Sequence, residues 1–249
     1  MKVLNIEHIK KTFGENQVLK GVDFSLEKGK IYVLMGTNGS GKTTLFNIIT
    51  GFLKADAGQI KLNNRNITNN EPHIINRMGI TRTFQDLRLI EDLTVLENVM
   101  LAFPNQEGEK WWKTLFPNKK IQQEQSENKQ KADEILKTCF IDNVANSKAG
   151  EISYGQQKLL TLACCIANDA EVFLLDEPVA GVNPEYRNQL ATVIQTLQKQ
   201  DKTFLIIEHN TDFIQAVSNK ILFLNEGVIK TYDTYEQMRN DEYVKEAYI

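Results

Sequence analysis

The sequence predicts an α/β fold in which a largely parallel sheet is wound with helices. From residue 171 onward, short β-rich runs alternate with helical stretches, which is typical of a parallel sheet. The first third of the chain consists mainly of β-rich runs separated by turn-forming residues. Residues 86–165 lack a strong strand pattern, so we expect them to form a helical subdomain inserted between two halves of one core.

The expected elements follow from these patterns in chain order. Strands are expected at residues 3–9, 18–26, 30–35, 58–62, 172–175, 203–207, 221–225 and 228–232. Helices are expected at residues 42–51, with Gly51 at the C-terminal end, at 94–137 apart from an irregular middle at 104–118, at 184–199 and at 210–217. We therefore expect one domain, 1–249, with a core lobe of residues 1–85 and 166–249.

Composition narrows the class of protein. The net charge of -3 gives no support for a nucleic-acid partner, which would usually require a basic patch. No apolar run approaches the ~18 residues of a membrane span, and the charged N-terminus lacks a signal core. The three cysteines, Cys139, Cys164 and Cys165, form no C-x-x-C pair, and the adjacent Cys164 and Cys165 are expected to be small core residues. We expect a cytosolic chain, alone or docked to a membrane partner.

Residues 36–43 read GTNGSGKT and fit the P-loop pattern G-x-x-x-x-G-K-S/T between a β-rich run and a helix. The glycines let backbone N–H groups turn toward phosphate oxygens, and the helix that follows adds its positive N-terminal end. In such loops the lysine, here Lys42, reaches the β- and γ-phosphates, and the threonine, here Thr43, binds Mg²⁺. The candidate nucleotide-binding residues are Gly36, Thr37, Asn38, Gly39, Ser40, Gly41, Lys42, Thr43 and Thr44.

Two acids and a histidine lie at the ends of apolar runs. Asp176 and Glu177 close the run at 172–175; beside a P-loop, the first is expected to hold Mg²⁺ and the second to take a proton from the attacking water. An acid pair after a strand is also typical of a helix N-cap. His209 follows the run at 203–207, and the shared edge of a parallel sheet would bring it to the γ-phosphate. A histidine at a strand end is more often structural.

Ser153, Tyr154, Gly155 and Gln156 open a predicted helix. In their order along the chain, the P-loop, this segment, the acid pair and His209 resemble the ATP-binding cassette (ABC) ATPases, over essentially the whole length. The resemblance implies a P-loop core with an N-terminal antiparallel β subdomain and an inserted helical subdomain. It also implies a dimer in which this signature segment binds the γ-phosphate of ATP held by the partner's P-loop. The family more often has Gly where this chain has Tyr154.

The resemblance assigns three further residues. Phe13 matches the aromatic that stacks on adenine, although it could be an ordinary strand aromatic. Gln85 matches a glutamine that touches Mg²⁺ or the attacking water and leads into the surface that receives the membrane partner, so Leu87 and Leu89 are expected in a docking surface. Asn183 matches the polar position of the D-loop, a segment that crosses the dimer interface; many members have Asp there.

Residues 79–89, 93–99, 153–157 and 241–248 look like the ATPases of branched-chain amino acid importers and their relatives. The resemblance implies an ATP-hydrolysing subunit at the cytoplasmic face of a membrane. Its partners would be a second ATPase subunit, identical or related, permease subunits and, through them, an extracytoplasmic solute-binding protein. Residues 176–184 and the tail are also similar to the lipopolysaccharide-export ATPase. A lipid exporter and a non-transport ABC ATPase therefore remain alternatives.

Three rival classes of protein fit this sequence less well. A chromosome-maintenance ABC ATPase would place a long coiled coil between P-loop and signature, a translation-associated one usually has two cassettes, and a P-loop kinase or GTPase would not need Ser153–Gln156. Residues 104–117, with Trp111, Trp112 and Phe116, do not fit the importers' pattern. They are either a loop that packs its aromatics on the helical lobe or a contact with a partner or lipid headgroups.

Overall fold

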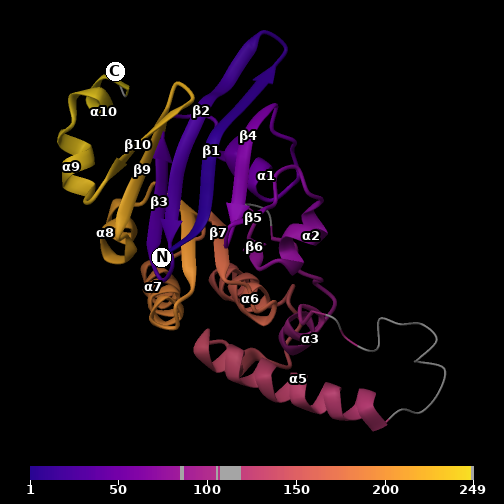
Figure 1. Ribbon diagram of the computed structural model, residues 1–249. Helices are drawn as coiled ribbons and strands as arrows, with labels where there is room; N and C mark the ends of the chain where they lie inside the picture. Colours follow the sequence, from indigo (N-terminus) through magenta and orange to yellow (C-terminus); the bar gives the residue numbers. More distant parts are fainter. Residues whose placement is uncertain (85–86, 105, 107–118, 248–249) are drawn as a thin grey trace. The chain divides into compact units, whose positions relative to one another are not determined.

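The computed structural model describes residues 1–84, 87–104, 106 and 119–247 (Figure 1). The chain forms two compact units: a core unit of residues 1–82, 170–180 and 194–249, and a helical unit of residues 83–169 and 181–193. This division differs from the expected one at residues 83–84, 166–169 and 181–193, which belong to the helical unit. The segment 181–193 does so because its Gly181 and Tyr186 pack on Tyr154 and Gly155 of the signature segment.

The centre of the core unit is a six-stranded sheet in the order β10-β9-β3-β8-β7-β6. All neighbouring strands are parallel except β10 and β9. The strands β3, β7 and β8 are buried along their whole length, as expected for apolar strands covered on both faces. The bounds are β3 Ile31–Gly36, β6 Ile80–Arg82, β7 Val172–Asp176, β8 Thr203–Ile207, β9 Lys220–Asn225 and β10 Val228–Tyr232.

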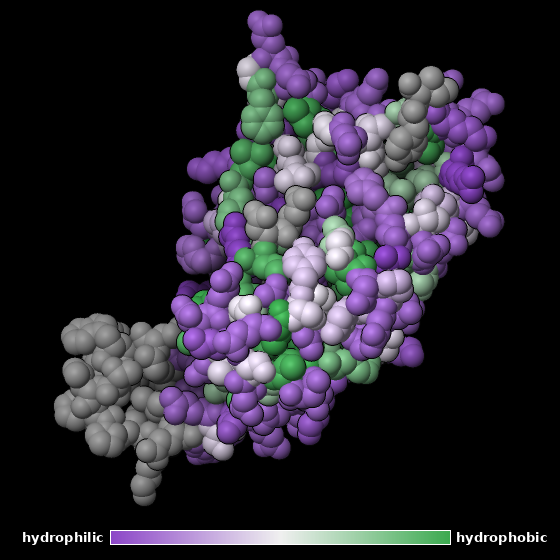
Figure 2. Space-filling view, turned by 180° about the vertical axis from the view of Figure 1, so that it is seen from behind, coloured by the Kyte–Doolittle hydropathy of each residue, from purple (hydrophilic) through white to green (hydrophobic). Residues whose placement is uncertain are grey.

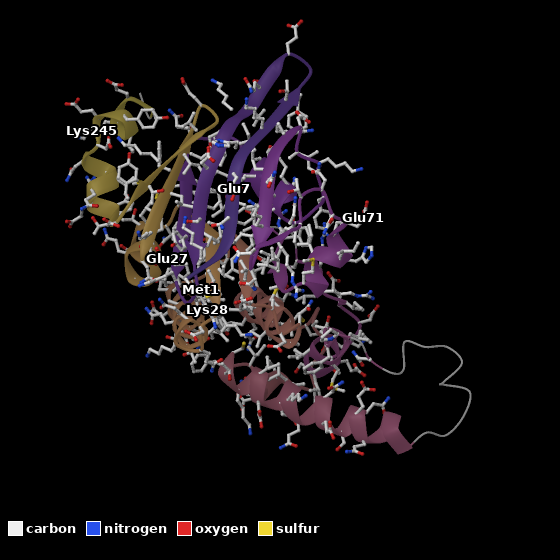
Figure 3. All side chains as sticks on the ribbon, in the orientation of Figure 1. Met1, Glu7, Glu27, Lys28, Glu71 and Lys245 are labelled. Carbon is white, nitrogen blue, oxygen red and sulfur yellow. The ribbon has the colours of Figure 1, made fainter. Side chains whose placement is uncertain are left out.

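A second, antiparallel sheet has the order β2-β1-β4-β5 and confirms the expected N-terminal β subdomain. Its strands are β1 Lys2–Phe13, β2 Asn16–Glu27, β4 Ala57–Leu62 and β5 Arg65–Asn66. Apolar side chains of β1, β2 and β4 pack with those of helix α1 (Lys42–Ile49) and the large sheet in one hydrophobic core. Met1 and Lys28 lie close together (Figure 3), and the amide of Lys28 donates to the carbonyl oxygen of Met1 over 2.9 Å.

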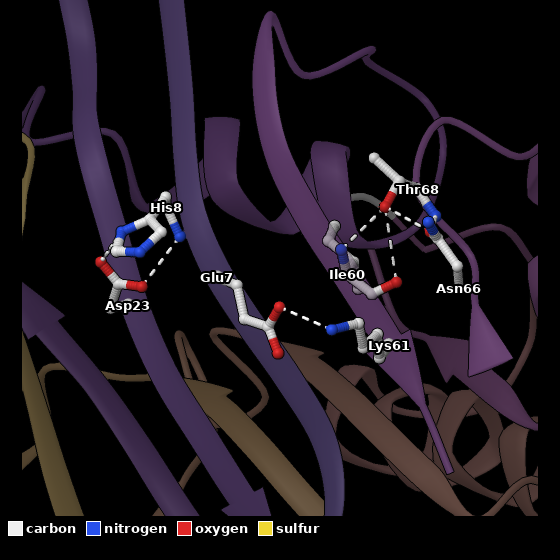
Figure 4. A network of polar contacts seen from close by, with 7 residues as sticks. All are labelled: Glu7, His8, Asp23, Ile60, Lys61, Asn66 and Thr68. Atoms are coloured by element: carbon white, nitrogen blue, oxygen red, sulfur yellow. Dashed lines mark hydrogen bonds and ion pairs between the residues drawn. The ribbon is translucent and has the colours of Figure 1, made fainter. Parts of the chain in front are cut away.

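The long strand β1 contains a bulge at His8, which has a φ of 50° (Figure 4). The amide of His8 leaves the ladder and donates to Asp23 Oδ1 over 2.8 Å, and Glu7 pairs with Lys61 of β4 over 2.7 Å. A Cβ on Gly58 would lie 2.5 Å from the carbonyl oxygen of His8. Gly58 therefore permits the close approach of β4 to the bulge.

Shorter helices complete the core unit: α2 Pro72–Arg77, α8 Thr211–Val217, α9 Tyr235–Asn240 and α10 Glu242–Ala247. The helix expected at residues 42–51 is α1, and Gly51 follows it with a φ of 78°. The expectation omitted α2, α9, α10, β5 and β6, because elements of two to six residues carry little periodicity. Helix α7 (Pro184–Lys199) contributes residues 184–193 to the helical unit and 194–199 to the core unit.

The helical unit is built from α3 (Val95–Leu101), α5 (Lys119–Thr138) and α6 (Tyr154–Ala167), with a short 3₁₀ turn at Asp142–Val144. Thr94 begins α3 with a capping box to Glu97. Cys165 is buried as expected, Cys139 is also buried, and Cys164 is half-buried. Burial raises the pKa of Cys164 to about 12. The Trp111 and Trp112 segment lies outside the described residues.

Figure 2 shows a mainly hydrophilic surface on the face of the molecule seen from behind.

Candidate functional site

Three parallel strands bring the candidate catalytic residues to one edge of the large sheet. In the register, Ile207 at the end of β8 lies beside Leu34 of β3 and Asp176 of β7. Gly36, Asp176 and Ile207 are the last residues of these strands, so the loops that follow them begin at the same edge. This is the position at which α/β sheets bind ligands.

The P-loop lies between β3 and α1 and leaves no room for side chains at two of its glycines. A Cβ on Gly36 would lie 2.1 Å from the carbonyl oxygen of Leu224, and one on Gly41 would lie 2.8 Å from Val18 Cγ1. A Cβ on Gly39 would meet nothing within 4 Å, so this part of the loop faces open space. The backbone therefore approaches its neighbours closely on one side and presents an open face on the other.

The side chain of Lys42 folds back over this loop. Its Nζ donates to the carbonyl oxygens of Gly36 and Thr37 over 2.9 and 2.8 Å. Burial lowers the pKa of Lys42, and the negative charges of Glu177 and Asp176 oppose that shift. Within the part of the chain that the structure describes, the buried hydroxyl of Ser40 has no hydrogen-bond partner. A cation and an unpaired hydroxyl beside an open glycine-rich backbone are suited to phosphate oxygens.

Asp176 forms a buried ion pair with Arg82, a residue that the sequence analysis missed. Nη2 of Arg82 donates to Asp176 Oδ2 over 2.9 Å, and both side chains are less than one-tenth exposed. Nη1 of the same guanidinium donates to Asn47 Oδ1 over 2.6 Å. Arg82 thus links β6, β7 and α1, and the sequence around it, Gly79-Ile80-Thr81, gives little signal of that role.

Glu177 takes a left-handed backbone conformation, with a φ of 48°, directly after β7. Its amide donates to the carbonyl oxygen of Ile207 over 3.0 Å. Its Oε1 lies 3.9 Å from His209 Nε2, which is longer than a hydrogen bond, and both side chains are partly exposed. Positive φ is uncommon outside glycine and concentrates at functional sites, so the conformation supports a role beyond strand termination.

Glu208, which the sequence analysis also missed, joins the loops after β7 and β8. Its Oε1 accepts from the amide of Val179 over 3.0 Å, and its Oε2 accepts from the amides of His209 and Asn210 over 2.8 and 3.0 Å. Glu208 is 3% exposed. This buried carboxylate thereby orients the backbone on either side of the Glu177–His209 pair. A charged residue directly after the apolar run 203–207 was the signal available in the sequence.

Phe13 ends β1 and is 48% exposed, a large fraction for a phenylalanine. The Nζ of Lys11 lies 5.5 Å from the centroid of its ring. Phe13 belongs to the same hairpin as Val18, which contacts Gly41 of the P-loop. The hairpin therefore presents an accessible ring from the strand pair that packs against the phosphate loop.

The signature residues belong to the helical unit. Ser153 caps α6: its Oγ accepts from the amide of Gln156 over 3.4 Å, and the side chain of Gln156 accepts from the amide of Ser153 over 2.9 Å. Ser153 and Tyr154 are exposed, and Gly155 is buried. Asn183 begins α7 by accepting from the amide of Tyr186 over 3.0 Å.

Thr43 is exposed and Thr44 is half-buried in the first turn of α1, and Gln85 lies outside the described residues. Among the residues that the structure describes, no group of three His, Cys, Asp or Glu side chains could hold a metal ion. Mg²⁺ in a nucleotide site needs fewer protein ligands, because it is usually held by one or two carboxylates together with substrate phosphates. Asp176 at the end of β7 is such a carboxylate, and Thr43 in the first turn of α1 adds a hydroxyl oxygen.

A parallel sheet with a P-loop, a buried aspartate and an adjacent glutamate at its carboxyl edge defines a P-loop nucleoside triphosphatase. Comparison with known proteins narrows the class. Residues 19–180 match the family described as ABC transporter. A probable branched-chain amino acid transport ATP-binding protein LivG of Methanocaldococcus jannaschii is 38% identical over 253 residues, covering 100% of this chain and 98% of that protein. LivG of Escherichia coli K12, described as high-affinity, is 34% identical, with coverages of 99% and 97%.

Solved structures agree with the sequence comparisons. A nucleotide-free ATP-binding cassette from an ABC transporter superposes with a TM-score of 0.85 at 37% identity, covering 100% of this chain and 99% of that one. The ADP conformation of an ABC transporter cassette gives a TM-score of 0.85 at 34% identity, with coverages of 100% and 98%.

The chain therefore belongs to the ABC transporter family. It is an ATP-binding subunit, an ATPase whose hydrolysis of ATP is coupled to transport. In the part of the chain that the structure describes, no helix has the length and apolar character needed to cross a membrane.

Proposed function

We propose that this chain drives the import of a branched-chain amino acid, or of a similar small polar solute, through separate membrane subunits. The observation that carries the proposal is similarity over the full length to transport ATP-binding proteins named for branched-chain amino acids, at 38% and 34% identity. The chain would act at the cytoplasmic face of the membrane, held there by permease subunits that also receive solute from an extracytoplasmic binding protein.

The P-loop is the ATP-binding element in this proposal. Its backbone N–H groups would surround the phosphates, with Lys42 at the β- and γ-phosphates and Phe13 stacked on the adenine. Thr43 and Asp176, with Gln85, would hold Mg²⁺, which neutralises charge on the phosphates when bound. The open face at Gly39, the unpaired hydroxyl of Ser40 and the exposed ring of Phe13 support this assignment.

Glu177 is the proposed general base, which takes a proton from the water that attacks the γ-phosphate. His209 would contact the γ-phosphate from the adjacent strand end, and Gln85 would orient the water. The shared sheet edge and the 3.9 Å separation of Glu177 and His209 support a common site for both residues. Ser153, Tyr154, Gly155 and Gln156 would complete the site of a partner subunit in an ATP-bridged dimer.

The membrane subunits would dock on the residues that follow Gln85. Asp86 lies outside the described residues, but Leu87 and Leu89 are half-buried and Ile90 is 51% exposed. Three nearly consecutive apolar residues with accessible surface are suited to a protein contact. A new aspartate at such a contact would be costly, because it would bury an unpaired charge.

The test is purification of the tagged chain from detergent extract, followed by identification and reconstitution of the membrane proteins that copurify. We expect permease subunits and ATP-dependent uptake of leucine, isoleucine or valine into vesicles. Leu87→Asp/Leu89→Asp should weaken assembly, whereas ATP binding by the free variant should be retained. If none of these three amino acids is taken up, the assignment of a branched-chain amino acid substrate is rejected. If the chain copurifies with a lipid-exporting complex, the assignment to import is rejected.

A further inference from the structure

Two tyrosines and two glycines interlock the signature segment with the segment 181–186. A Cβ on Gly155 would lie 2.3 Å from Cδ2, 2.5 Å from Cγ and 3.0 Å from Cβ of Tyr186. A Cβ on Gly181 would lie 3.4 Å from Cε1 of Tyr154. Each segment thus supplies one glycine and one tyrosine to the contact, and all four residues belong to the helical unit.

The contact at Gly155 has no tolerance for a larger residue. Side-chain carbons do not normally approach one another to 2.3 Å, so an added methyl group would force a shift. The neighbouring atoms are the ring and Cβ of Tyr186, close to the backbone of α7, rather than the far end of a flexible chain. Relief therefore requires movement of the ring or of the first turn of α6.

The backbone of residues 181–187 is organised to place Tyr186. Gly181 has a φ of 71°, which favours glycine. The Oδ1 of Asn183 accepts from the amide of Tyr186 over 3.0 Å, and the amide of Arg187 donates to the carbonyl oxygen of Asn183 over 3.0 Å. These bonds define the start of α7 and therefore the direction in which the ring of Tyr186 leaves it.

We infer that Tyr186 is a positioning residue for the signature segment: by packing on Gly155 it sets the orientation of the first turn of α6 and so of Ser153. The inference rests on the proposed role of Ser153 at a partner's ATP. It also gives Gly155 a second reason to be glycine, besides exposing backbone N–H groups to phosphate. The two reasons differ in what happens when Tyr186 is removed.

The test compares variants in a Glu177→Gln background, with ATP-driven dimerisation measured by light scattering over a range of ATP concentrations. Gly155→Ala should raise the ATP concentration at half-dimerisation by about tenfold or more, the scale expected for overpacking. Tyr186→Ala should cause a smaller loss, because the ring that orients the segment is missing, and Gly155→Ala/Tyr186→Ala should recover to the level of Tyr186→Ala, because the methyl group then has room. Tyr186→Phe keeps the ring and is the matched control: it should not rescue Gly155→Ala.

The outcomes separate this inference from the proposed function. Failure of the Glu177→Gln parent to dimerise with ATP would reject the ATP-bridged dimer, and the positioning role with it. A parent that dimerises, together with a double variant no better than Gly155→Ala, would overturn the inference alone. If Gly155→Ala does not fold, Tyr186→Ala is compared with Tyr186→Phe. Loss of ATP-driven dimerisation in Tyr186→Ala alone supports the positioning role, and no loss in either variant overturns it. Binding of a fluorescent ATP analogue by each variant shows that the P-loop is intact.

Discussion

Arg82 donates a hydrogen bond of 2.9 Å to Asp176 across the interior of the core unit, and both side chains are less than one-tenth exposed. The guanidinium also bonds Asn47 of α1 and lies 5.4 Å from the ring centroid of Phe46. The carboxylate proposed to hold Mg²⁺ is therefore already paired with a cation of this chain. Its orientation depends on a residue from a different strand.

Arg82→Met should destabilise the protein by about 3–5 kcal/mol, the scale expected when one partner of a buried ion pair is removed. Urea denaturation measures the loss. Arg82→Met/Asp176→Asn should be more stable than Arg82→Met alone, since the double variant has no buried charge at this position. Equal stability of Arg82→Met and the unaltered protein would show that the pair makes no net contribution.

Glu177→Gln should reduce hydrolysis of ATP by about 10²- to 10⁴-fold while binding is retained, because the amide keeps the shape but cannot take a proton. Steady-state phosphate release and nucleotide titration measure the two effects on the same preparation. With ATP and Mg²⁺ this variant should also double in mass by light scattering. Near-normal turnover would reject Glu177 as the base.

Phe13→Ala should weaken ATP binding by about 5- to 150-fold, the scale of one lost stacking contact of about 1–3 kcal/mol. The ring is 48% exposed, so its removal should leave the fold intact. Phe13→Tyr keeps the stacking surface and serves as the control. Inorganic triphosphate, which has no base, should bind both variants equally; weaker triphosphate binding by Phe13→Ala would indicate damage to the P-loop instead.

Asp241 fastens the C-terminal helices to β10, and its contribution should depend on pH. Its carboxylate pairs with Lys230 and accepts from the hydroxyl of Tyr232 over 2.9 Å. The bond from Lys230, followed by that from Tyr232, lowers the pKa of Asp241, and the bond to Asp241 raises the pKa of Lys230. Burial, then the bond to Asp241, raises the pKa of Tyr232 to about 12, which keeps its hydroxyl a donor.

Because the pKa of Asp241 is lowered in the folded state, its carboxylate stabilises the fold above the ordinary value of about 3.9. That stabilisation is lost as pH falls through the folded-state pKa. A raised lysine pKa stabilises it below about 10.4 and is lost as pH rises further. Asp241→Asn should therefore lower Tm between about pH 5 and 9, with a difference that shrinks as pH falls below about 3.9. Glu236→Gln, at an exposed carboxylate of α9, is the control. A difference that persists undiminished at pH 3 would contradict the assignment.

Local patterns in the sequence were sufficient to predict the parallel core strands, the first helix, the P-loop and the acid pair. The signature segment, Phe13 and Gln85 came from the resemblance to ABC ATPases. A run such as residues 172–176 reads as a buried strand by itself, and a P-loop is continuous in the chain. The short elements β6 and α2 were not predictable, because so few residues show no period. Because β6 was not predicted, the position of Arg82 beside Asp176 was not predicted either.

The tertiary structure alone decided which distant residues meet. Arg82 and Asp176 are separated by 94 positions, and Glu208 reaches Val179 across 29. Nothing in either segment specifies the partner, because the pairing depends on strand order and on which groups are buried together. The fit of Tyr186 onto Gly155 likewise depends on the packing of the first turn of α7 on the first turn of α6. The sequence by itself determined the chemistry available to this protein, and packing decided which side chains hold that chemistry in place.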